Sequence, residues 1–157
     1  MRVIVESELA DSDFESGIEI QRWEQLAHQA LKTENIEDGE LSLFFIDEKV
    51  MAELNIEHMG KEGATDVLAF PIDGPENLED GLPVKATDPP RLLGDIFVCP
   101  SVARRNAHAH SKSFEDEIAL LVVHGILHIL GHDHAEHEET LKMKERERIL
   151  LAEHHRS

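Results

Sequence analysis

The stretch "VVHGILHILGHDHAEH", from Val122 to His137, places five histidines at the end of the longest apolar run of the sequence. Together with the residues before it, the segment 117–131 predicts a buried helix. Ser113, followed by two acidic residues, is typical of the start of such a helix. Gly131 stands where a helix ends with a residue in the left-handed conformation. The sequence therefore predicts one central helix that carries histidines at its C-terminal end.

His124 and His128 are four positions apart, so on a helix their Cβ atoms lie about 5–6 Å apart. After the turn at Gly131, His134 lies on the returning segment, and three imidazoles can hold one zinc ion while the fourth coordination position stays open for water. The alternative is that these histidines are ordinary core or surface residues. Unpaired imidazoles within this apolar segment would be costly to desolvate, which favours the metal site. His132 and His137 are weaker candidates.

The spacing of the three histidines matches the zinc-protease pattern H-E-x-x-H-x-x-G-x-x-H except at one residue. Those proteases use the glutamate after the first histidine as a general base. Here that position is Gly125, which has no side chain to move a proton. The glycine therefore argues against peptide hydrolysis.

The remaining sequence predicts a small sheet with a helical layer, which is an α+β fold. Short β-branched or apolar runs predict strands, and apolar residues at helical spacing predict amphipathic helices, one of which buries Trp23. Asp47 is typical of a helix N-cap. The segment 72–90 contains four of the six prolines and is predicted to be a long acidic loop. The predicted strands are 2–6, 40–47, 65–71 and 91–100, and the predicted helices are 18–32, 48–58, 101–110, 117–131 and 136–155.

Length and composition limit the function classes. A chain of 157 residues suits one domain, 1–157. The formal net charge of −18 argues against indiscriminate nucleic-acid binding, so contacts with RNA must be local. The lone Cys99 cannot form an internal disulfide, and the N-terminus lacks the pattern of a secretory signal, so we expect a cytoplasmic protein. No apolar run is long enough to cross a membrane.

The motifs "HGILHILGHDH", "GATDVLAFPID" and "LLGDIFVCP" closely resemble those of the YbeY family of bacterial endoribonucleases. The resemblance extends from about Glu40 to Leu151. It implies a mixed four-stranded sheet with about five helices and a metal site in a cleft at the end of a central helix. It also implies that His124, His128 and His134 bind one Zn²⁺ ion, with His124 placed among the catalytic residues.

The same resemblance implies a zinc-dependent, single-strand-specific endoribonuclease. Family members act in late ribosome maturation, especially at the 3′ end of the small-subunit (16S) RNA, and in ribosome quality control. The implied partners are ribosomal RNA and the ribosome, with a ribosomal protein or a GTPase as a further candidate, and neither DNA nor a membrane. Two alternatives stay open: a non-catalytic ribosome assembly factor with a structural metal, and a metallohydrolase of small esters or amides. Three imidazoles also accept nickel or copper.

Two further residues are candidates for catalysis. Many family members have an arginine at the position that is Met59 here, and Lys61 is the basic residue nearest to it. A lysine is a point charge and lacks the planar fork of arginine, so the replacement is not equivalent, and Lys61 is also interpretable as an ordinary exposed lysine. Asp133 would hold the far nitrogen of a ligand imidazole, or would be a turn residue.

Three arginines flank the strand "LLGDIFVCP" and form the other concentration of positive charge. They would line a rim that faces RNA phosphates, or they would be solvated residues at a helix start. These residues are Arg91, Arg104 and Arg105.

Overall fold

The computed structural model describes residues 1–9, 19–72, 91–132 and 136–155. Within these ranges it contains four strands and five helices in the predicted order, which confirms the α+β class. From residue 73 on, the predicted loop 72–90 lies outside the described residues. The elements are β1 (Arg2–Ser7), α1 (Ile20–Thr33), β2 (Glu40–Phe45), α2 (Glu48–Met59), β3 (Val67–Pro71), β4 (Leu92–Val98), α3 (Pro100–Ala109), α4 (Phe114–Ile129) and α5 (His137–His154).

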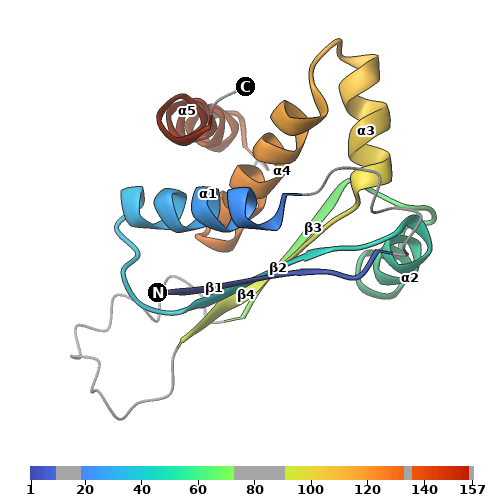
Figure 1. Cartoon of the computed structure of the whole chain (residues 1–157), viewed down its shortest axis with the longest axis horizontal. Coiled ribbons are helices and arrows are strands. Elements are labelled where there is room, and N and C mark those ends of the chain that lie inside the picture. Colours follow the sequence, from blue (N-terminus) through green and yellow to red (C-terminus); the bar gives the residue numbers. More distant parts are fainter. Residues whose placement is uncertain (10–18, 73–90, 133–135, 156–157) are drawn as a thin grey trace.

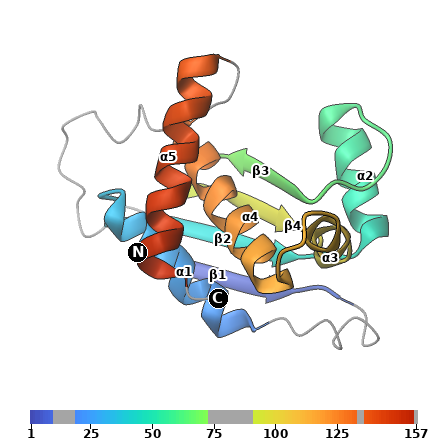
Figure 2. The same ribbon diagram turned by 90° about the horizontal axis from the view of Figure 1, so that it is seen from above.

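The four strands form one mixed sheet in the order β1-β2-β4-β3. β1, β2 and β4 are parallel, and β3 pairs antiparallel with β4. The sheet is therefore of the mixed kind that the family resemblance implied, and β3 is one of its edges. Figures 1 and 2 show α1 and α4 on one face of this sheet, with α5 lying over both helices as an outer layer.

α4 is the central helix of the molecule, because it contacts the sheet and three other helices. Ten of its sixteen residues are buried, including Val122, Ile126 and Leu127. It approaches β4 closely at Gly125, where an added Cβ atom would lie 2.9 Å from Cγ2 of Ile96. A glycine at this position therefore lets the helix lie directly on the strand.

The other face of the sheet is partly covered by α2, which forms a second apolar cluster with alternate strand residues. Met51 is fully buried there, and Phe44 and Phe97 stack with ring centroids 5.0 Å apart. The predicted N-cap is confirmed, since the Asp47 side chain accepts a hydrogen bond from the Val50 amide at 2.9 Å. Cys99 is buried in the same cluster, and burial raises the pKa of its thiol.

α1 lies on the face of the sheet that α4 covers, and it buries Trp23 as the sequence predicted. No helix in the described ranges is both long and apolar enough to span a membrane.

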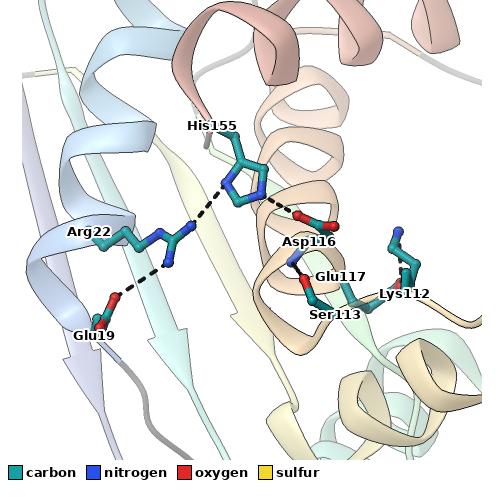
Figure 3. Close-up of polar contacts among 7 residues, drawn as sticks. All are labelled: Glu19, Arg22, Lys112, Ser113, Asp116, Glu117 and His155. Carbon is teal, nitrogen blue, oxygen red and sulfur yellow. Dashed lines mark hydrogen bonds and ion pairs between the residues drawn. The ribbon is translucent and has the colours of Figure 1, made fainter. Parts of the chain in front are cut away.

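The C-terminal end of α5 is bound to α1 and α4 by two histidines that the sequence does not single out, His154 and His155. The His155 side chain is only 9% exposed, and its Nε2 donates to Asp116 Oδ1 on α4 at 2.7 Å (Figure 3). Its Nδ1 faces the Arg22 guanidinium on α1 at 3.5 Å. His154 Nε2 lies 2.7 Å from Thr33 Oγ1, also on α1. We call these five residues the C-terminal clasp.

Replacement of Gly125 by alanine tests the close approach of α4 to β4. Helix propensity alone would stabilise this variant by about 1 kcal/mol. We expect the reverse, a loss of about 1–3 kcal/mol, because the new methyl group overpacks against Ile96. Urea unfolding measures the difference, and a variant that is as stable as the parent chain would contradict the close approach.

The C-terminal clasp makes a pH-dependent contribution to stability. The hydrogen bond from His155 is the main cause that holds the pKa of the Asp116 carboxyl below its usual 3.8. We expect Asp116→Asn to cost roughly 1 kcal/mol at neutral pH, as is typical of one hydrogen bond. Because the pKa is lowered in the folded state, this difference is fully present well above pH 3.8 and is lost as the pH falls through the lowered value.

Urea unfolding of the metal-free chain and of this variant, from pH 7 into the acid range, measures the loss. Glu115→Gln removes a charge from the same helical turn and serves as the control. A loss of stability that stayed constant at every pH would contradict a role for the ionised Asp116.

Candidate metal centre

His124 and His128 lie one turn apart near the C-terminal end of α4, and both are half-buried. The helix ends where the sequence predicted. The amide of His132 donates to the carbonyl of Leu127 at 3.0 Å, and the amide of Gly131 donates to the carbonyl of His128 at 3.1 Å. Gly131 has a φ of 99°, so the chain reverses through a left-handed glycine. The returning segment therefore begins beside the last turn of α4.

α5 contributes a carboxylate to this end of the molecule. Glu147 Oε1 lies 2.6 Å from His124 Nδ1, and the two side chains are 13% and 34% exposed. A carboxylate only accepts hydrogen bonds at neutral pH, so Nδ1 carries the proton of this bond, and in the neutral imidazole Nε2 is the nitrogen that would bind a cation. A carboxylate on the far nitrogen is typical of histidines that bind metals.

Two pockets flank the imidazoles, and each has a lysine from α5. A pocket of about 390 Å³ is lined by His124, Thr140, Met143, Lys144 and Glu147. A smaller one, of about 230 Å³, is lined by Leu130, Gly131, His132, Glu139 and Lys142. Each pocket thus pairs one lysine with one glutamate, Lys144 with Glu147 and Lys142 with Glu139.

The third predicted ligand, His134, and the predicted supporting residue, Asp133, lie outside the described residues. In residues 1–9, 19–72, 91–132 and 136–155, no group of three or more His, Cys, Asp and Glu side chains gathers as a metal site. The two imidazoles on α4 nevertheless fit a zinc ion, because they lie one helical turn apart and one of them has a carboxylate on its far nitrogen. The zinc site remains a prediction.

The structure gives a second reason to exclude protease chemistry. Gly125 holds the place of the protease glutamate, and a side chain there would point at Ile96 in the sheet. A glutamate would meet the core at this position and could not act as a base for a water molecule beside the imidazoles.

Lys61 lies on the exposed turn that follows α2. The turn is held by the buried Asn55, whose side-chain amide donates to the carbonyl of Gly63 at 2.8 Å. Met59, at the position where an arginine was expected, is 51% exposed. The catalytic role of Lys61 stays a prediction.

The start of β3 is fixed by Asp66, a residue whose role sequence reasoning missed. Its Oδ1 accepts a hydrogen bond from the Val67 amide at 2.8 Å, and its Oδ2 accepts one from the Asn106 side chain on α3 at 3.2 Å. Asp66 thus links β3 to the helical layer.

The three arginines predicted as a phosphate-facing rim do not form one. Arg91 precedes β4, whereas Arg104 and Arg105 lie on α3 beyond its other end, so the length of a strand separates them. Arg105 pairs with Glu48 of α2, and the Arg104 guanidinium lies 4.2 Å from the centroid of the Phe114 ring.

Sequence reasoning also missed the contributions of α5 to this site. Glu147 lies among alternating charges on an otherwise exposed helix, a pattern that indicates solvation. Nothing local marks it as the partner of a histidine 23 positions earlier. Lys142 and Lys144 were likewise indistinguishable from solvated residues.

Known proteins are similar to this chain over most of its length. A family model described as Endoribonuclease YbeY matches residues 8–155. The Endoribonuclease YbeY of Frankia casuarinae is 39% identical over 158 residues, which cover 97% of this chain and 74% of that protein. The one of Salinispora tropica is 49% identical over 115 residues, 73% of each chain. The solution structure of a target protein from Thermotoga maritima has a TM-score of 0.60 at 25% identity and covers 96% of this chain and 90% of its own.

Proposed function

Because the chain belongs to the YbeY family of endoribonucleases, as its histidine motif predicted, we propose that it is a zinc-dependent endoribonuclease that cleaves single-stranded ribosomal RNA. The observation that carries the proposal is the pair of imidazoles on α4, one of them fixed by Glu147 at 2.6 Å. His124, His128 and His134 hold one zinc ion.

The side chains around the imidazoles suit a phosphodiester. When bound, zinc supplies a Lewis acid that lowers the pKa of water and neutralises charge on a phosphate oxygen. Lys142 and Lys144 line the two flanking pockets and bind backbone phosphates of the RNA. These local groups offset the repulsion between RNA and a protein of net charge −18.

We propose the 3′ end of the small-subunit (16S) RNA as the substrate and the ribosome, in the cytoplasm, as the setting of late maturation and quality control. The strongly acidic composition favours a basic partner, such as a ribosomal protein, at surfaces away from the histidines. A GTPase is the second candidate partner.

His128→Ala tests the zinc-dependent nuclease directly. We expect the variant to lose its zinc and to cleave ribosomal RNA more than about 100-fold more slowly, since the loss of a ligand exceeds the 10–100-fold effect of an outer residue. Zinc content is measured by atomic emission, and cleavage by gel analysis of purified RNA, of intact ribosomes, and of matched single-stranded and duplex oligonucleotides.

His108→Ala, which removes an exposed histidine on α3, is the control and is expected to change neither quantity. The proposal fails if His128→Ala keeps both its zinc and its cleavage. Metal-free protein that still binds ribosomes but has lost its fold would favour an assembly factor with a structural metal. Turnover of simple esters or amides without cleavage of RNA would favour a small-molecule metallohydrolase.

A further inference from the structure

The carboxylate of Glu147 is held close to the predicted zinc ligand by the way α5 lies on α4. Met143 and Leu150 are buried members of the main apolar cluster, and Glu147 lies between them on the same side of the helix. The far end of α5 is fixed by the C-terminal clasp, and Arg146 pairs with Glu34, which follows α1, at 2.7 Å. α5 therefore cannot turn about its axis without breaking contacts at several places.

Glu147 binds His124, whereas the charged residues next to it in the sequence bind other partners. Arginines stand on either side of it in the sequence, and both bind other carboxylates. Arg146 binds Glu34 at 2.7 Å, and Arg148 binds Glu145 at 2.6 Å. Glu147 instead lies 2.6 Å from His124 Nδ1 while only 13% exposed. Removing a carboxylate from water is costly, so a short bond from this largely buried carboxylate to an imidazole indicates a specific role.

This bond selects one of the two neutral forms of the imidazole. With the proton of His124 on Nδ1, the lone pair is on Nε2, which is the form that binds a metal through Nε2. The bond also fixes the plane of the ring, so that the imidazole does not have to be ordered when an ion binds.

We propose that Glu147 is a positioning residue for the zinc site: its carboxylate keeps His124 in the Nδ1-protonated form and thereby sets the affinity for the ion. The inference rests on the proposed function, since it takes His124 to be a zinc ligand. It gives to a residue of α5 a supporting role of the kind that the sequence suggested for Asp133, whose own role stays a prediction.

The test compares Glu147→Ala and Glu147→Gln with Glu145→Gln in the full-length chain. Glu145 lies on the same helix, is exposed and binds Arg148, so its variant removes the same charge without touching His124. Zinc affinity is measured by competition with a chelator. We expect the dissociation constant to rise about 10–100-fold in Glu147→Ala, less in Glu147→Gln, whose amide oxygen still accepts from Nδ1, and to stay unchanged in Glu145→Gln.

A second readout needs neither zinc nor RNA. Two-bond ¹H–¹⁵N correlation spectra of the metal-free chain report which nitrogen of each imidazole is protonated, and the His124 signals are identified by their absence in His124→Gln. We expect Nδ1 to carry the proton in the parent chain and in Glu147→Gln. In Glu147→Ala we expect the proton to redistribute toward Nε2. Thermal unfolding of the isosteric Glu147→Gln separates this effect from a loss of fold.

The outcomes distinguish this inference from the proposed function. If Glu147→Ala binds zinc as tightly as Glu145→Gln and His124 keeps its protonated nitrogen, the inference is wrong, while the nuclease proposal stands on the parent chain's zinc and cleavage. A parent chain that bound no zinc would overturn both, even with the expected protonation of His124.

Discussion

The close approach of α4 to β4 is the constraint on which the rest of the structure depends. At Gly125 an added Cβ atom would lie 2.9 Å from Cγ2 of Ile96, so this face of the helix packs directly against the sheet. His124, the preceding residue, is thereby turned toward α5, where its Nδ1 meets Glu147. Gly125 thus stands in place of the glutamate that proteases use as a base, and it also lets α4 pack directly on β4. Glycine in place of the protease glutamate at position 125 therefore has both a chemical and a steric consequence.

α5 connects the stability of the fold with the candidate metal centre. Its C-terminal end is held by His154 and His155, and its middle supplies the carboxylate that binds His124. Its N-terminal half carries the lysines of the two pockets beside the imidazoles. A helix that the sequence marks only by its charge therefore orients the histidine and places two lysines near it.

Sequence reasoning succeeded where the physical cause is local. The caps Asp47 and Ser113 bind amides three residues ahead, and the left-handed Gly131 ends α4 within a few residues of the histidines. It failed where the partner is distant. His155 binds Asp116, which lies 39 positions earlier, and Glu147 binds His124, which lies 23 positions earlier. No periodicity of the sequence encodes such pairs. The prediction of an arginine rim failed for a related reason. Residues that flank a strand are close in the sequence, but the length of the strand separates them in space.

The central claim is that three imidazoles converge on one cation and leave a coordination position to solvent. The most direct measurement is a crystal structure of the zinc-loaded chain, with anomalous diffraction recorded at the zinc absorption edge. We predict one anomalous peak per chain, about 2.0–2.1 Å from a nitrogen of each of His124, His128 and His134, with a water molecule in the fourth position. Rings that point apart, or a fourth protein donor in the place of the water, would contradict the account.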